Sequence, residues 1–532
     1  MAAVHDLATY RETAGANAGP MRVAIIGSGV AGICQAIKLL EAGIEFTIYE
    51  KASDIGGTWR DNTYPGCSCD VPLHLYQYSF EMSPEWRNKF ADHAQIKAYL
   101  DRVVEKYGLR PFIKLNCAVD SAIFDEAAGT WQLTTEHGEQ VDANVLVAGT
   151  GQLNRPQLPN IPGTEDFMGD AWHSARWNHD VDLAGKRIAV IGNGASAIQF
   201  VPEIAKQAGN VTIFQRSASW VLPRPERIFK EWEKNLYRRF PWLMWIQRTR
   251  MWLNGEQLLL SFRHLGWALK KGHVKESEEY VSDPEKRAKL LPDYDPGCKR
   301  VLFSNDWWPA MGRSNVDIET TGIERITETG IRTVDGTDHK FDVIVYGTGF
   351  DTNHFLGPVD VKGLGGRDLR AEWKDGADAH LGIGVSGYPN FYLLYGPNTN
   401  LGHNSIIYMI ECQAAYVTQI ARKLRDDNLA YADVRATAQA EWDRGVQADN
   451  AKSVFASGCT SWYKTADGRI TNNWPNSTLT YKRMTKRVNW DDYAVVAREA
   501  GQARAAAEYA ACATEDRYIA RRTSVRPLGN AF

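Results

Sequence analysis

The chain has 532 residues, and 61 Lys and Arg against 64 Asp and Glu leave a formal charge of −3. No large basic excess exists that would neutralise a phosphate backbone or hold the chain on a bilayer, so we expect no nucleic-acid partner. With 44% hydrophobic residues the chain is typical of globular proteins, and about 150 residues per domain predicts three or four folding units.

The N-terminal residues lack the apolar run of a secretory signal, and no stretch approaches the roughly 18 apolar residues of a membrane span. We therefore expect a cytoplasmic protein without integral membrane association. The eight cysteines include no CxxC pair and no zinc-like quartet, which predicts reduced thiols and no metal site. Cys67 and Cys69 form a CxC pair, a spacing that does not suit a redox-active disulfide.

After a loose arm over residues 1–20, the pattern strand–helix–strand occurs twice. The expected elements are a strand over 22–27, a helix over 30–42 and a strand over 45–50, then a strand over 186–192, a helix over 195–208 and a strand over 211–216. Two further apolar strands end in Gly-Thr-Gly, at 149–151 and at 347–349. The pattern predicts an α/β fold with two Rossmann-like dinucleotide-binding domains.

The first strand–helix turn carries Gly27, Gly29 and Gly32, the spacing at which a backbone can approach a pyrophosphate. Glu50 ends the following strand, 18 residues after Gly32. A carboxylate at this position accepts hydrogen bonds from an unphosphorylated ribose, which favours FAD or NAD.

The second turn has the same form with alanine in third place, and its strand ends in a cation instead of an acid. Arg216 can pair with a 2′-phosphate, so this turn favours NADP. The residues predicted to contact NADP are Gly192, Asn193, Gly194, Ala195, Ser196, Arg216 and Ser217. One site of each kind indicates hydride transfer from NADPH to a bound flavin, and the spacing leaves open whether a disulfide, a quinone or dioxygen takes the electrons.

Between the domains, residues 228–273 are rich in Trp, Arg and Lys and predict an inserted helical subdomain. Its aromatic residues are compatible with a hydrophobic access route or a membrane surface, but a helical core is the favoured interpretation. The segment from Asp491 is rich in Ala and Arg and predicts a helical tail.

Two motifs resemble fingerprints of the Baeyer–Villiger monooxygenases. Phe167, Gly169, His173 and Trp177 match Phe-x-Gly-x3-His-x3-Trp, and residues 57–70 match Gly-x-Trp-x4-Tyr-Pro-Gly-x3-Asp. The resemblance extends from about Val23 to His403. It implies a FAD-binding domain over 21–152 and 386–490, an NADP-binding domain over 153–225 and 298–385, a helical insertion over 226–297 and a tail over 491–532.

The resemblance also implies a chemistry. NADPH reduces FAD, and a flavin C4a-peroxide formed with O2 attacks a ketone to give an ester or lactone. A fixed cation would stabilise the anionic charge, and Arg300, which follows Lys299, matches the position of the family's arginine. Asp70 would orient Arg300, while Lys299 would help Arg216 to bind the 2′-phosphate. Relatives contact FAD at the positions of Gly57, Thr58, Trp59, Asp70, Tyr76 and Val119.

His173 and Trp177 resemble residues that link domain rearrangement to NADP binding, although a hydrogen-bonded linker histidine and a packed tryptophan explain the same pattern. A related monooxygenase acting on sulfur or amines stays open as an alternative activity. The expected protein is a monomer or homodimer acting on a bulky ketone, in a pocket covered in part by the loop 457–463.

Overall fold

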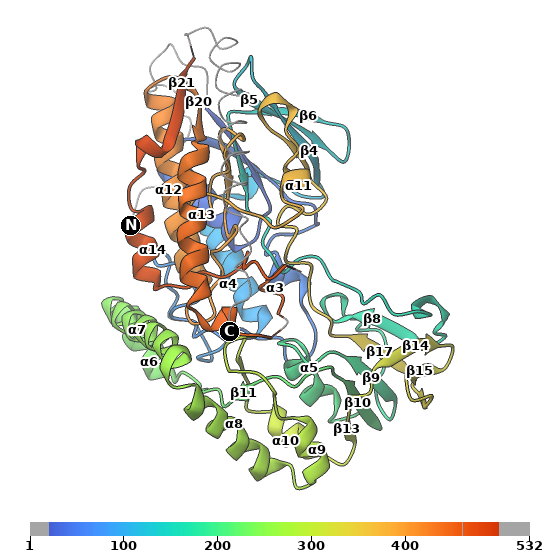
Figure 1. Cartoon of the computed structure of the whole chain (residues 1–532). Coiled ribbons are helices and arrows are strands. Elements are labelled where there is room, and N and C mark those ends of the chain that lie inside the picture. Colours follow the sequence, from blue (N-terminus) through green and yellow to red (C-terminus); the bar gives the residue numbers. More distant parts are fainter. Residues whose placement is uncertain (1–20, 460, 466, 499–532) are drawn as a thin grey trace, which may run out of the picture.

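The structure, a computed structural model, describes residues 21–459, 461–465 and 467–498, and it has two lobes (Figure 1). The larger lobe contains a five-stranded parallel sheet in the order β19-β7-β1-β2-β3. Its strands are β1 (Arg22–Ile26), β2 (Glu45–Tyr49), β3 (Ile113–Lys114), β7 (Val145–Ala148) and β19 (Phe391–Leu393). The inner strands are apolar along almost their whole length because both faces of this parallel sheet are covered, one by helices and the other by a smaller antiparallel sheet.

The smaller lobe repeats this design with a second parallel sheet in the order β13-β10-β9-β17-β8. Its strands are β8 (Asp170–His173), β9 (Arg187–Ile191), β10 (Asn210–Phe214), β13 (Val316–Glu319) and β17 (Val343–Tyr346). The predicted α/β fold with two Rossmann-like sheets is therefore confirmed.

Helices cover one face of each sheet, and antiparallel strands cover the other. In the larger lobe α2 (Val30–Glu41) lies beside α12 (Ile406–Asp426), where the Gln35 amide donates to Thr418 Oγ1 at 3.0 Å. The other helices of this lobe are α3 (Thr58–Asp61), α4 (His93–Lys106), α11 (Leu369–Glu372), α13 (Ala436–Ala451) and α14 (Thr478–Thr485). The smaller lobe has α5 (Ala197–Ile204), α9 (Pro284–Lys289) and α10 (Trp307–Met311).

Smaller sheets correct two predicted boundaries. β18 (Asp360–Lys362) pairs with β4 (Val119–Asp125), which continues antiparallel into β5 (Thr130–Thr135) and β6 (Gln140–Ala143). Residues 360–362 thus lie with the larger lobe, although the sequence predicted the NADP-binding domain to continue to 385. β21 (Tyr493–Ala497) pairs with β20 (Leu429–Val434), where the sequence predicted a helical tail. The arm 1–20 and the rest of the tail, 499–532, lie outside the described residues.

The predicted helical insertion is present as α6 (Glu231–Arg239), α7 (Trp242–His264) and α8 (Gly266–Tyr280) (Figure 1). Among the described residues no helix combines the length and apolar character needed to cross a membrane. The short parallel pair β11 (Val221–Leu222) and β12 (Leu302–Phe303) joins both ends of the insertion to the smaller lobe. The smaller lobe also contains an antiparallel sheet of β14 (Ile323–Thr327), β15 (Gly330–Thr333) and β16 (Asp338–Lys340).

The two chain segments that cross between the lobes run side by side. Pro156 and Phe350 form an antiparallel bridge, and on either side of it Gln157 N–H donates to the Gly349 carbonyl and Asp351 N–H to the Arg155 carbonyl. The side chains of Arg155 and Asp351 form an ion pair at 3.2 Å. The crossings therefore make a two-stranded ribbon.

One covalent link was not predicted. Cys298 and Cys459 form a disulfide across 161 residues of sequence, with Cα atoms 6.2 Å apart. The interpretation of all eight cysteines as reduced thiols is therefore wrong for this pair. The other described cysteines, Cys34, Cys67, Cys69, Cys117 and Cys412, are free.

Candidate active site

The first glycine turn has the shape that a pyrophosphate requires. Gly27 has φ +98°, and a Cβ there would lie 2.8 Å from the carbonyl oxygen of Gly149, at the end of β7. A Cβ on Gly32 would lie 1.9 Å from the Gly27 carbonyl oxygen. The atom nearest to a Cβ on Gly29 would be the Gly57 Cα, at 3.7 Å. The outer glycines close the turn, and the middle one leaves space for a ligand, so the turn fits a dinucleotide.

Glu50 lies at this turn, directly after β2. Its carboxylate is buried and accepts hydrogen bonds from the backbone N–H and the hydroxyl of Ser28, both at 2.8 Å. Its second oxygen lies 3.2 Å from the Arg60 guanidinium. Glu50 is therefore fixed beside the turn, and its contact with a ribose stays a prediction.

Of the residues predicted to line the flavin, Trp59 and Tyr76 pack in one core cluster of the larger lobe and Val119 in another. Thr58 and Trp59 begin α3, and the Trp59 indole N–H donates to the Tyr76 hydroxyl at 3.2 Å. Burial raises the pKa of the Tyr76 phenol well above its usual range. Val119 begins β4 and is buried.

The second turn repeats the geometry of the first. Gly192 has φ +106°, and a Cβ there would lie 2.4 Å from the carbonyl oxygen of Gly347, at the end of β17. A Cβ on Gly194 would have no atom within 4 Å. Ala195 is exposed and Ser196 precedes α5, so the backbone of this turn is open to a ligand. The Asn193 amide holds the loop after β10 through hydrogen bonds to Gln215 Oε1 at 2.7 Å and the Ser217 carbonyl at 2.9 Å.

The cations predicted to bind a 2′-phosphate share one cavity of about 790 Å³. Arg216 follows β10 and is exposed, and the Lys299 ammonium donates to the Ser217 hydroxyl at 2.6 Å. Burial lowers the pKa of Lys299, and Arg216 adds to this effect, while Asp293 opposes it. The structure thus brings together Arg216, Ser217 and Lys299, and adds Lys270 to the same cavity. Asp293 and Asp295 line the cavity too, and Asp295 pairs with Lys270 at 2.7 Å, so Arg216 and Lys299 are the cations that fit a phosphorylated ribose.

Arg300 and Asp70 form the pair that the sequence predicted. Arg300 Nη2 lies 2.9 and 2.8 Å from the two carboxylate oxygens of Asp70, and Nε lies 3.3 Å from one of them. Asp70 raises the pKa of Arg300, so the guanidinium keeps its charge at any working pH. Both side chains are only partly exposed, at 31% and 22%.

The sequence did not single out two tyrosines near this pair. Burial raises the pKa values of the Tyr395 and Tyr463 phenols. Both phenols are close enough to Arg300 for its positive charge to oppose that rise. Tyr395 has φ +63°, and its hydroxyl donates to Asn400 Oδ1 at 2.6 Å. Tyr395 belongs to the segment 395–403 of the family resemblance, and Tyr463 lies in the loop predicted to cover the pocket. Nothing in the spacing of these two tyrosines indicated that they lie near Arg300.

The Phe-x-Gly-x3-His-x3-Trp motif lies along β8, at the edge of the second sheet. Phe167 packs beneath that sheet, and a Cβ on Gly169 would lie 2.6 Å from the Phe167 ring. His173 Nδ1 accepts the Ala175 N–H, its ring meets that of Phe350 at 5.8 Å, and burial lowers its pKa.

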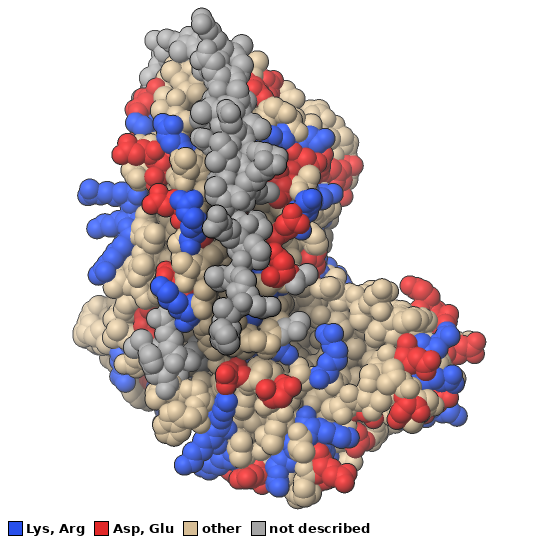
Figure 2. Space-filling model, in the orientation of Figure 1, with Lys and Arg blue, Asp and Glu red and all other residues tan. Residues whose placement is uncertain are grey.

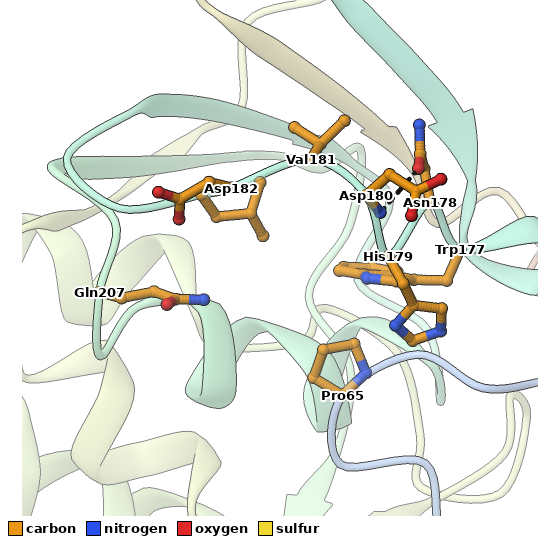
Figure 3. A pocket seen from close by; sticks show the side chains of 9 residues that line it. Pro65, Trp177, Asn178, His179, Asp180, Val181, Asp182 and Gln207 are labelled. Carbon is orange, nitrogen blue, oxygen red and sulfur yellow. Dashed lines mark hydrogen bonds between the residues drawn. The ribbon is translucent and has the colours of Figure 1, made fainter.

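Trp177 and the Tyr-Pro-Gly loop line one small cavity of about 360 Å³, and Figure 3 shows Trp177 and His179 on the side of it that faces Pro65. The Thr63 hydroxyl and His179 Nε2 are 2.9 Å apart. The Tyr64 hydroxyl donates to Gln199 Oε1 on α5 at 3.0 Å. The two sequence motifs therefore meet at the contact between the lobes.

Comparisons with known proteins agree with this arrangement. The family model of flavin-binding monooxygenase-like proteins matches residues 20–357. A Baeyer-Villiger monooxygenase of Pseudomonas aeruginosa is 39% identical over 499 residues, 92% of this chain and 94% of the relative. Another, from Streptomyces coelicolor, is 40% identical over 90% of this chain and 93% of the relative.

Among solved structures, an oxidized steroid monooxygenase bound to NADP matches with a TM-score of 0.80 at 28% identity, over 90% of this chain and 100% of that chain. The OTEMO complex with FAD and NADP matches with a TM-score of 0.81 at 25% identity and the same coverage. The fold and the paired turns define a class of oxidoreductases with two dinucleotide sites. The chain belongs to the flavin-binding monooxygenase-like family and, within it, to the Baeyer–Villiger monooxygenases.

Proposed function

We propose that the chain uses NADPH and O2 to insert one oxygen atom beside a ketone carbonyl, which gives an ester or a lactone. The observation that carries the proposal is the Arg300–Asp70 pair, a cation that is held in place by both carboxylate oxygens and keeps its charge. Such a cation suits a reaction in which negative charge develops on oxygen and no proton has to be removed.

FAD occupies the first turn and NADPH the second. The backbone around Gly29 receives the pyrophosphate of FAD, and Glu50 holds its ribose, with Trp59 and Tyr76 lining the flavin. Arg216 and Lys299 bind the 2′-phosphate of NADPH in the larger cavity. When bound, FAD supplies the hydride acceptor and the activation of dioxygen, so the protein has to orient the reactants and keep the site dry.

Arg300 stabilises the negative charge that develops on oxygen when the ketone carbonyl is attacked. Asp70 holds the guanidinium in one orientation through both carboxylate oxygens and preserves its charge. His173 and Trp177 couple the position of the second sheet to that of the Tyr-Pro-Gly loop, because His173 contacts Phe350 and Trp177 lines a cavity with Pro65. A monomeric or homodimeric state and a cytoplasmic location complete the proposal.

The direct test measures oxygen transfer. The purified protein, saturated with FAD, is supplied with NADPH, isotopically labelled O2 and a panel of cyclic, aromatic and steroid-like ketones. We expect one labelled oxygen atom in an ester or lactone, and an Arg300→Ala variant that still binds both nucleotides but loses about 100-fold or more in ketone turnover. NADPH oxidation without label in any ketone product would refute the proposal, and labelled sulfoxides or amine oxides alone would establish the sulfur- or amine-oxygenating alternative.

A further inference from the structure

Exposed apolar side chains follow one face of the helical pair α6 and α7. On α6, Trp232 is 62% exposed, Leu236 38% and Phe240, just beyond the helix, 39%. On α7, Trp242, Trp245, Ile246 and Leu253 are between 47% and 57% exposed. Their spacing of three, four and seven residues places them on one side of each helix. The sequence favoured a helical core for the aromatic residues of this insertion, and for these tryptophans that interpretation is wrong.

The opposite side of the same helices is packed against the larger lobe. The ring of buried Tyr237 lies 5.1 Å from that of His74. Arg248 is 5% exposed, and its Nη1 donates to the carbonyls of His74, Leu75 and Gln77. The exposed apolar side chains therefore form the outer surface of a firmly attached pair of helices.

Helix α14 continues this surface with positive charge. The Trp252 indole N–H on α7 donates to the Thr478 hydroxyl at 2.8 Å, and its ring stacks on Tyr408 at 6.4 Å. The Lys482 ammonium of α14 lies 5.6 Å from the centre of the same Tyr408 ring. Two apolar residues of α14, Leu479 and Met484, are 37% and 43% exposed. The apolar surface of α7 thus runs directly into α14.

Four basic residues, Lys482, Arg483, Lys486 and Arg487, are exposed at α14, and residues 477–490 contain no Asp or Glu. Within the part of the chain that the structure describes, none of these four forms an ion pair with a carboxylate. Figure 2 shows Lys and Arg side chains projecting from the side of the molecule that carries α14 in Figure 1. The charge balance of the whole chain hides this local excess.

We propose that this surface binds the anionic headgroups and the outer acyl region of a phospholipid bilayer, so that the enzyme is a peripheral membrane protein. We call it the α7–α14 face, and it consists of Trp232, Leu236, Phe240, Trp242, Trp245, Ile246, Leu253, Leu479, Lys482, Arg483, Met484, Lys486 and Arg487. Tryptophan favours the interface between headgroups and acyl chains, and Lys and Arg are attracted to anionic lipids.

Charge complementarity favours a bilayer over a second copy of the chain. In a symmetric contact between two copies, the four cations of one α14 would meet either the same cations or uncharged tryptophans of the other copy. Their positive charge would then have no negative partner. An anionic bilayer pairs with the cations and buries the tryptophans at once. Apolar ketones dissolve in the same acyl region, so the location would concentrate such substrates near the enzyme.

The experiment is co-sedimentation of the FAD-loaded enzyme with vesicles of phosphatidylcholine alone and of phosphatidylcholine mixed with phosphatidylglycerol. We expect binding to the mixed vesicles that is at least about tenfold stronger, because each basic residue near an anionic surface contributes roughly fivefold. Binding should fall at about 1 M salt, where the Debye length is about 3 Å.

Two variants test the two parts of the face. We expect Arg483→Glu with Arg487→Glu to weaken binding to the mixed vesicles by about tenfold or more, and Trp242→Ser with Trp245→Ser to weaken binding to both kinds of vesicle. The matched control is Val334→Ser with Lys340→Glu, which should bind like the unchanged enzyme. Val334 is an exposed apolar residue in the turn between β15 and β16 of the smaller lobe, and Lys340 is an exposed basic residue at the end of β16. Flavin absorbance and NADPH oxidation in solution show that each variant is folded.

Equal binding of all variants, or no binding of the unchanged enzyme, would overturn the proposal. So would light scattering that shows a dimer which the tryptophan substitutions dissociate, because the face would then be a contact between two copies of the chain.

Discussion

At the scale of single residues, Asp70 serves in the proposed reaction as a positioning residue, because it acts through Arg300. Replacing Asp70 with Asn removes the charge and one of the two acceptor oxygens that hold the guanidinium. We expect Asp70→Asn to lower kcat for ketone oxygenation by about tenfold or more, since a misplaced electrostatic group loses much of its effect. KM for NADPH should stay unchanged. A role in folding alone would instead lower the amount of FAD-loaded enzyme without changing kcat per flavin.

Lys299 gives a pH dependence whose sign follows from its surroundings. Because burial and Arg216 lower its pKa, Lys299 loses its proton at a lower pH than an ordinary lysine, and its attraction for a 2′-phosphate is lost as the pH rises. We expect KM for NADPH to increase in the alkaline range. The increase should be smaller in Lys299→Arg and absent for NADH, which lacks the phosphate. A parallel increase for both nucleotides would exclude this role for Lys299.

Residue types at motif positions could be predicted from the sequence, but their partners in space mostly could not. The family resemblance paired Arg300 with Asp70 across 230 positions, and the structure places them in contact. The hydrogen bond from Asn193 to Gln215 and the proximity of Tyr395 and Tyr463 to Arg300 depend on side-chain directions that no periodicity records.

At the scale of elements, the parallel strands were predicted to within one or two residues. Buried parallel strands are short apolar runs that end in glycine, as in β7 and β17, and such runs are visible in the sequence. β18 and β21 are short strands paired with distant partners, so their presence depends on tertiary contacts. The helix predicted over 195–208 is shorter in the structure, Ala197–Ile204, because its first residues belong to the open glycine turn.

Arg248 attaches the insertion to the larger lobe. Arg248→Ala would remove the guanidinium that donates hydrogen bonds to three backbone carbonyls. It would also remove the cation whose Nη2 lies 3.9 Å from the Glu411 carboxylate. We expect a loss of about 3 kcal/mol in the free energy of unfolding, measured by urea titration. Arg250→Ala, two residues along on the exposed side of α7, is the control and should change stability by less than about 0.5 kcal/mol. Similar losses in both variants would show that the carbonyl contacts contribute little.

At the scale of the whole molecule, the Cys298–Cys459 disulfide joins the segment before Arg300 to the loop that lines the cavity of Arg216 and Lys299. Sequence spacing could not predict it, because the two cysteines are 161 residues apart and belong to no motif. We expect mass spectrometry of the unreduced protein to find their two peptides joined. Closing a loop of this length stabilises a fold by about 5 kcal/mol in the chain-entropy estimate, so Cys459→Ser should lower Tm. Alkylation of both cysteines in the native, unreduced protein would contradict the link.

The ribbon made by the two lobe crossings has a mechanical consequence. Two hydrogen-bonded strands resist displacement along their own plane, so the ribbon limits sliding of the smaller lobe, while the Tyr64–Gln199 contact joins the lobes at a second place. Phe350 pairs with Pro156 in the ribbon, and its ring lies 5.8 Å from that of His173. The fingerprint histidine therefore touches the point where the two crossing segments are joined, so a change in its contacts would act on both crossings at once.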